Sequence, residues 1–230
     1  MKPCFKRVII DIKDLMNSPI ENIYYFPDEE NILSGHALII GPKNTPYSYG
    51  NYIFEFIFSE EYPFKPPKVI FKSNDGKTRF NPNLYRNGKV CLSILNTWSG
   101  DQWSACQTIR SILLTLQTTL TEMPLLNEPG VTTANMNSIL QYNKIIEFKN
   151  YEFTILYYIS NIDKIPVQNP ELVAKITEHF DKSKNEILLE ISKLKDKEEN
   201  AKINLSIYDM HAAINYNELY NRACKIINKN

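Results

Sequence analysis

The apolar residues along the chain predict one amphipathic helix followed by four short strands. Near the N-terminus they recur three or four positions apart, as in a helix with one buried face, at Phe5, Val8, Ile12 and Leu15. We expect this helix over about residues 6–16, because Pro19 ends it. Extended segments separated by turn-forming clusters then follow at residues 23–26, 32–40, 52–58 and 68–72. Consecutive strands at this spacing predict an antiparallel meander.

The second half of the chain has a helical pattern. All seven glycines lie at or before position 130, and only two of the 13 prolines lie beyond it. Ser104 is the expected N-cap of a helix that ends near Met123, and a further helix is expected over residues 137–159. Asn169 and Pro170 then predict the start of another helix. Its apolar stripe is Leu172, Ile176, Phe180, Ile187, Ile191 and Leu194.

Composition narrows the class of protein. The 230 residues carry 26 basic and 26 acidic side chains, and this balance favours neither nucleic acid nor a membrane as a partner. No apolar run reaches the roughly 18 residues of a membrane span, and the N-terminus lacks the apolar centre of a signal peptide. The four cysteines form no pair typical of a metal site or disulfide framework. We therefore expect an intracellular protein, cytoplasmic and/or nuclear, with no metal.

Residues 73–101 contain the most informative pattern. They show little periodicity but many Asn and Gly residues, which indicates a long structured loop, and loops of this length tend to be functional. Within it, Cys91 follows an Asn81-Pro82-Asn83 tripeptide and stands eight positions after Asn83. Cys4, Cys106 and Cys224 lack such surroundings, and we interpret them as buried or incidental residues.

At this point the sequence resembles the ubiquitin-conjugating enzyme family. That family has a His-Pro-Asn signature eight positions before its thioester-forming cysteine, so Cys91 and Asn83 match and Asn81 replaces the histidine. The proline-rich segment 62–69 and the Trp103-Ser104 pair also resemble family motifs. Residues 97–101 and 127–130 look most like the Z class, which carries a C-terminal extension.

The resemblance implies a fold and a domain organisation. The fold class is α/β (α+β), with an N-terminal helix, a four-stranded antiparallel meander, a long active-site loop and C-terminal helices. Residues 1–160 would form the catalytic core, and residues 161–230 a helical extension packed on it. The implied activity is transfer of ubiquitin or a ubiquitin-like protein, received from an activating enzyme as a thioester on Cys91, to a lysine amine.

Transthiolation requires an accessible thiol, and no cofactor is expected because the activating enzyme uses the ATP. Asn83 can donate an N–H to the oxyanion, a contact typically worth about 2.7–4 kcal/mol, or its amide can brace the loop. Glu128 matches the family's groove acid, although a one-residue shift would put Asn127 there, and a solvated loop acid is the other interpretation.

Three further loop residues have assigned interpretations. Asn81 is expected to be structural, as the family histidine is. Tyr85 either flanks the cysteine groove or packs in the loop. Ser93 occupies a place where many relatives carry Asp, so either the acidic environment is weaker here or Glu128 supplies it by itself.

Partner contacts follow from the resemblance. Lys6 and Arg7 on the first helix, Phe64 in the proline-rich loop, and Ala105 with Cys106 match positions that contact an activating enzyme or a ligase. Without the resemblance, Lys6 and Arg7 would be read as a solvated helix face. The expected partners are the modifier, an activating enzyme, a ligase and protein substrates.

Two other classes of function stay open at this stage. A catalytically weak or inactive scaffold of the same fold would bind ubiquitin without transferring it, but the presence of Asn83 and Cys91 argues against it. A thiol hydrolase would need one of His36, His179 and His211 beside Cys91.

Overall fold

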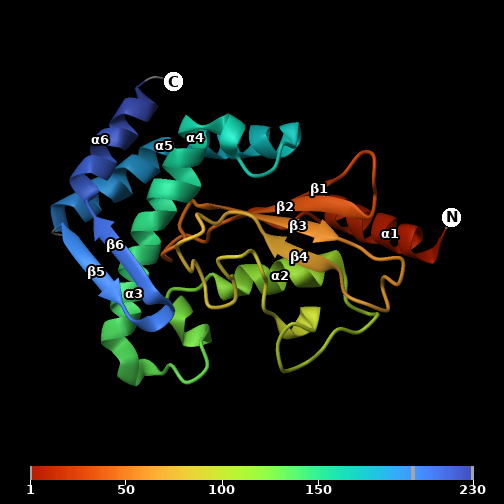
Figure 1. The fold of residues 1–230 in the computed structure, drawn as a ribbon. Coiled ribbons are helices and arrows are strands. Elements are labelled where there is room, and N and C mark those ends of the chain that lie inside the picture. Colours follow the sequence, from red (N-terminus) through yellow and green to blue (C-terminus); the bar gives the residue numbers. More distant parts are fainter. Residues whose placement is uncertain (1, 198–199, 229–230) are drawn as a thin grey trace.

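Helix α1 (Pro3–Asn17) forms where the N-terminal periodicity predicts it, in a computed structural model that describes residues 2–197 and 200–228. A proline occupies its first turn, where the missing N–H costs no hydrogen bond. The helix buries Cys4, Val8, Asp11 and Ile12 and packs against α2 (Ile109–Thr119). Figure 1 shows α1 at the opposite end of the molecule from the last helix, α6 (Tyr216–Ile227).

The four predicted strands pair as a single antiparallel sheet in the order β1-β2-β3-β4, which confirms the meander. They are β1 (Ile23–Pro27), β2 (Ser34–Ile40), β3 (Asn51–Ile57) and β4 (Lys68–Phe71). Side chains alternate between the two faces of each strand. On β2, Ala37 and Ile39 join the main core with α1 and α2, whereas Leu38 and Ile40 pack against residues that follow position 157. Apolar side chains therefore cover both faces of the sheet.

Helix α2 (Ile109–Thr119) begins four residues later than predicted, and the assignment of Ser104 as its cap was wrong. Thr108 is the N-cap: its hydroxyl accepts from the Ser111 N–H at 3.2 Å, and the Ser111 hydroxyl accepts from the Thr108 N–H at 2.9 Å. This reciprocal pair gives acceptors to two backbone N–H groups at the start of the helix, which a cap at Ser104 would not do. The helix also ends at Thr119, earlier than predicted.

The helix predicted over residues 137–159 exists but changes its winding. It runs as α3 (Met136–Lys149), the π-helix η4 (Asn150–Tyr157) and α4 (Tyr158–Ser160). Two buried side chains of β3 donate hydrogen bonds to the π-helix: the Asn51 amide donates to the Thr154 carbonyl at 2.8 Å, and the Tyr52 hydroxyl donates to the Asn150 side chain at 2.6 Å. These bonds fix the helix to β3.

The C-terminal region begins with α5 (Pro170–Lys197), whose N-cap is Asn169 as predicted, since its side chain accepts from the Leu172 N–H at 2.9 Å. The prediction that this region is helical was incomplete. A hairpin, β5 (Ala201–Leu205) and β6 (Met210–Ile214), precedes α6 (Tyr216–Ile227). Alternating burial, with Ile203, Leu205 and Met210 inward, drives this hairpin.

The hairpin lies along α3, and α6 packs on α5 and η4 (Figure 1). The inward side chains of the hairpin belong to the same apolar cluster as side chains of the four-stranded sheet and of α2. The division at residue 160 stays a prediction. Short 3-10 helices complete the chain at η1 (Ser93–Leu95), η2 (Pro124–Asn127), η3 (Thr133–Asn135), η5 (Ile162–Lys164) and η6 (Ile207–Asp209).

Candidate active site

Cys91 lies where the turn-rich loop ends and η1 begins. Its backbone N–H donates to the Asn83 carbonyl at 2.8 Å, so residues eight positions apart in sequence lie side by side. The residue is 3% exposed. Its Sγ donates to the Thr97 carbonyl at 3.0 Å. In this conformation the thiol is ordered and sheltered.

Thr97 surrounds Cys91 with hydrogen bonds to both of its neighbours. Its hydroxyl accepts from the Leu92 N–H at 2.9 Å and lies 2.9 Å from the Val90 carbonyl and 3.0 Å from the Leu92 carbonyl. Together with the bond from the Cys91 Sγ to the Thr97 carbonyl, these contacts fix the backbone on either side of the thiol. No role for Thr97 was expected from the sequence. The only signal was its place in the segment 97–101 that resembles the Z class.

We expect Thr97→Val to loosen this arrangement, because the Leu92 N–H loses its acceptor. The free energy of unfolding should fall by about 1 kcal/mol, and alkylation of Cys91 by iodoacetamide should become about fivefold faster. Urea unfolding and mass spectrometry of the alkylated peptide measure the two effects. Thr118→Val, at an exposed hydroxyl on α2, is the matched control. Equal alkylation rates in both variants would contradict the assigned role.

The side-chain amide of Asn83 also faces Cys91. Its Nδ2 donates to the Cys91 carbonyl at 2.8 Å, and its backbone N–H donates to the Asn81 side chain at 2.9 Å. The buried Asn83 Oδ1 has no hydrogen-bond partner among the described residues. Asn83 thus braces the loop in this state, and an amide has two N–H donors, of which this bond uses one.

Asn81 is fully buried, and its amide donates to the Tyr47 hydroxyl and the Thr119 carbonyl, both at 2.8 Å. The Pro82 carbonyl accepts from the Arg79 guanidinium at 2.6 Å. These bonds join the loop to α2 and to the β2–β3 connection. Such contacts fit the structural role expected for Asn81.

Glu128 is half-buried at the end of η2, and its carboxylate accepts a hydrogen bond from the Tyr208 hydroxyl at 2.5 Å. Asn127 is exposed, and its amide donates to the Thr119 carbonyl at 3.2 Å. The carbonyl of Thr119 thereby joins Asn127 to Asn81. Of the two candidates for the groove acid, Glu128 is the one held by a residue of the C-terminal hairpin.

Tyr85 and Ser93 complete the loop. The Arg79 guanidinium lies 3.2 Å from the centre of the Tyr85 ring, and the Tyr85 N–H donates to the Lys89 carbonyl at 2.9 Å. Ser93 is half-buried in η1 and lies next to Gly100, where an added Cβ would be 3.2 Å from the Ser93 Cβ. Segment 97–101 therefore folds back over the start of η1.

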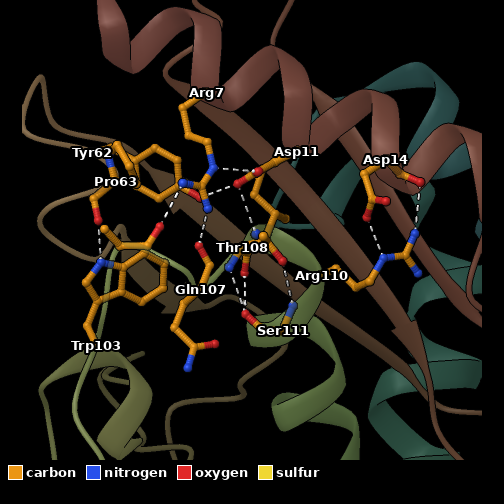
Figure 2. Close-up of polar contacts among 12 residues, drawn as sticks. Arg7, Asp11, Asp14, Tyr62, Pro63, Trp103, Gln107, Thr108, Arg110 and Ser111 are labelled. Carbon is orange, nitrogen blue, oxygen red and sulfur yellow. Dashed lines mark hydrogen bonds and ion pairs between the residues drawn. The ribbon is translucent and has the colours of Figure 1, made fainter.

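The five predicted partner residues differ in their exposure. Phe64 is 79% exposed, and Lys6 and Cys106 are also on the surface. Arg7 instead points inward, as Figure 2 shows, and donates to the Ala105 carbonyl at 2.8 Å and to the Asp11 carboxylate at 2.9 Å. A contact of Arg7 with a partner stays a prediction, and its guanidinium first of all joins α1 to the segment before α2.

We expect Arg7→Ala to lower the free energy of unfolding by about 2 kcal/mol, because it leaves Asp11, 2% exposed, without its cation. Lys6→Ala, next to it and exposed, should change this free energy by less than about 0.5 kcal/mol. Urea unfolding of both variants tests the difference. If the two variants lowered the free energy of unfolding by the same small amount, the Arg7 guanidinium would not be the group that fixes α1.

The thiol-hydrolase alternative has no support from the contacts. His36 is on β2, His179 on α5 and His211 on β6. The ring of His179 contacts Ser183, and that of His211 contacts Asn204 and Asp209. No hydrogen bond joins a histidine to Cys91 in the described part of the chain. Among those same residues, no group of three His, Cys, Asp or Glu side chains is arranged to hold a metal ion.

Across residues 2–197 and 200–228, every helix is too short or too polar to cross a bilayer.

The meander and the cysteine loop define the α/β ubiquitin-conjugating fold. A family model described as ubiquitin-conjugating enzyme matches residues 7–150. The match covers more than half of the chain. The chain therefore belongs to the ubiquitin-conjugating enzyme family.

Relatives support the resemblance to the Z class. Over 128 residues the chain is 44% identical to ubiquitin-conjugating enzyme E2 Z of Homo sapiens, covering 55% of this chain and 36% of that protein. The E2 Z enzyme of Danio rerio is also 44% identical over 128 residues, which are 55% of this chain and 39% of that protein. The probable ubiquitin-conjugating enzyme protein 17 of Caenorhabditis elegans is 38% identical over 134 residues, which are 54% of this chain and 18% of that protein. The chain thus spans well under half the length of these relatives.

Proposed function

We propose that this protein accepts ubiquitin or a ubiquitin-like protein from an activating enzyme as a thioester on Cys91 and transfers it to a lysine amine, usually with a ligase. The observation that carries the proposal is the pairing of Cys91 with Asn83: each donates an N–H to the other's carbonyl, at 2.8 Å in both directions. This pairing places an amide donor directly beside the proposed nucleophile.

The proposed chemistry has two steps. Cys91 loses its thiol proton to solvent, and the thiolate adds to the C-terminal carbonyl carbon of the modifier, which expels the thiolate of the activating enzyme. A neutral lysine amine then adds to the same carbon and loses a proton, and the Cys91 thiolate leaves. The product is an isopeptide bond. In this proposal the chain itself uses no cofactor, and ATP is consumed by the activating enzyme.

Each step develops negative charge on the carbonyl oxygen of the modifier. A second N–H of the Asn83 amide can donate to this oxygen while the first still bonds the Cys91 carbonyl. The half-buried Glu128 carboxylate is the group proposed to orient the lysine and to assist its deprotonation.

The sheltered thiol adds a requirement. Because Cys91 is 3% exposed and its Sγ–H is bonded to Thr97, an incoming thioester reaches the sulfur only after that bond breaks. Residues 96–102 are exposed, and within this segment Thr97 contacts Cys91 and Gly100 lies next to Ser93. We therefore propose that charging includes a shift of this segment.

A charging assay tests the proposal. The purified protein is incubated with ATP, ubiquitin or a ubiquitin-like protein, and each available activating enzyme, and the products are separated with and without a reducing thiol. We expect an adduct that the thiol removes. If no adduct forms with any pair of activating enzyme and modifier, the active-enzyme proposal fails, and a binding scaffold of the same fold becomes the function to measure.

A further inference from the structure

The tip of the β5–β6 hairpin has an unusual backbone. Tyr208 and Asp209 adopt the left-handed conformation, with φ of 61° and 47°, although neither is glycine. This conformation costs a residue with a side chain roughly 1–2 kcal/mol, so it persists where surrounding contacts require it.

Two arginines of the active-site loop hold the tip. The Arg79 guanidinium lies between two aromatic rings, 3.2 Å from the centre of Tyr85 and 4.9 Å from the centre of Tyr208. Arg86 donates to the Tyr208 carbonyl and, at 3.2 Å, to the Asp209 carbonyl. The left-handed turn is what presents both carbonyls to a single guanidinium.

Helix α3 supports the same contact from behind. The ring of Tyr142 packs edge-on against Tyr208, with centroids 6.2 Å apart, and its hydroxyl donates to the Arg79 carbonyl at 2.6 Å. The Arg79 N–H contacts the Met210 sulfur at 3.2 Å. The Tyr208 ring is therefore fixed on several sides, and its hydroxyl has little freedom to move.

That hydroxyl reaches Glu128. It donates to the Glu128 Oε2 at 2.5 Å, and the second carboxylate oxygen, Oε1, takes no part in this bond. Burial, together with the neighbouring Glu128 carboxylate, raises the pKa of Tyr208 above its ordinary value. Tyr208 thus keeps its proton and acts as the donor at physiological pH.

We propose that Tyr208 is a positioning residue of the active site, and that the C-terminal hairpin holds the Glu128 carboxylate in the orientation that receives the acceptor lysine. The inference rests on the proposed function and deepens it. Glu128 lies between η2 and the exposed Pro129-Gly130 turn, a short loop that by itself leaves the carboxylate several rotamers. The Tyr208 bond selects one rotamer and leaves Oε1 for the amine.

The test is discharge of the preformed ubiquitin thioester to free lysine under single-turnover conditions, as a function of lysine concentration. We expect Tyr208→Phe, which keeps the ring and removes the hydroxyl, to lower the maximal discharge rate about tenfold, while the rate of charging is unchanged. Tyr220→Phe, at a hydroxyl on α6, is the matched control and should discharge like the wild type.

A double mutant separates positioning from general loosening of the fold. If Tyr208 acts through Glu128, Tyr208→Phe should have no further effect on discharge in a Glu128→Gln background. Equal discharge by Tyr208→Phe and the wild type, or effects that multiply in the double mutant, would overturn the inference and leave the proposed function intact. Failure of the wild type to charge would overturn the proposed function, and the inference with it.

Discussion

Cys91→Ser should lower transfer of the modifier to lysine by about a thousandfold or more and replace the thiol-sensitive adduct with a thiol-resistant one. An alkoxide is a much poorer leaving group than a thiolate, so the serine ester, once formed, does not pass its acyl group to an amine. The fold should be retained, because serine is close in size and the Thr97 carbonyl can accept from its hydroxyl as it does from the thiol. Gels with and without reducing agent measure the outcome.

Cys106→Ser is the control for this experiment. Cys106 is exposed and lies in the segment before α2, so a thiol that reacts through accessibility alone would be this one. We expect this variant to keep the thiol-sensitive adduct. Its rate of charging is not the readout, because Cys106 matches a predicted partner contact. Loss of the adduct in Cys106→Ser, with retention in Cys91→Ser, would assign the chemistry to the wrong sulfur and contradict the proposed function.

Asn83→Ala should lower the rate of discharge to lysine by about 100- to 1,000-fold, the cost typical of losing one oxyanion donor. Discharge is the step to measure, because amine attack on the thioester forms an oxyanion that the Asn83 amide is proposed to stabilise. Single-turnover discharge of the charged variant measures it. The free energy of unfolding should fall too, since the Cys91 carbonyl loses its side-chain donor.

Bracing of the loop is the competing role for Asn83. Asn87→Ala separates the two roles, because Asn87 also braces the loop, accepting from the Lys89 N–H at 3.0 Å, but has no bond to Cys91. We expect Asn87→Ala to discharge within a few fold of the wild type. If the two variants slowed discharge equally, rigidity of the loop would account for the effect, and the oxyanion role would be wrong.

The sequence predicts the first half of the fold well because its elements have strong local signals. In α1 a single apolar stripe decides the buried face, and the meander alternates short apolar runs with turn residues. The first residue of α2 is harder to predict from the sequence. Ser104 and Thr108 are both good caps, and the choice depends on the reciprocal bond with Ser111, which becomes visible only in the folded chain.

The hairpin of the C-terminal region was missed for an identifiable reason. Its strands do alternate, with Ile203 and Leu205 inward and Lys202 and Asn204 outward, but each is only five residues long. Its turn has no glycine, and the left-handed positions are filled by Tyr208 and Asp209. Without a turn signal, two short alternating runs cannot be distinguished from irregular helix.

The candidate site likewise has one part that the sequence predicts and one part that it does not. The resemblance to the family signature identifies Asn83 and Cys91 as a pair, and local hydrogen bonds join the two residues in the folded loop. The contact of Glu128 with Tyr208 joins residues 80 positions apart. Only packing of the hairpin on α3 brings them together, and no local pattern predicts that.

The most direct measurement is peptide mapping by mass spectrometry of the charged protein, prepared with a matching activating enzyme and digested under conditions that preserve thioesters. We predict that the C-terminal residues of the modifier are attached to the peptide containing Cys91, through a bond that a reducing thiol cleaves. An adduct on Cys4, Cys106 or Cys224, or only on lysine, would contradict the assignment of Cys91 as the residue that carries the modifier.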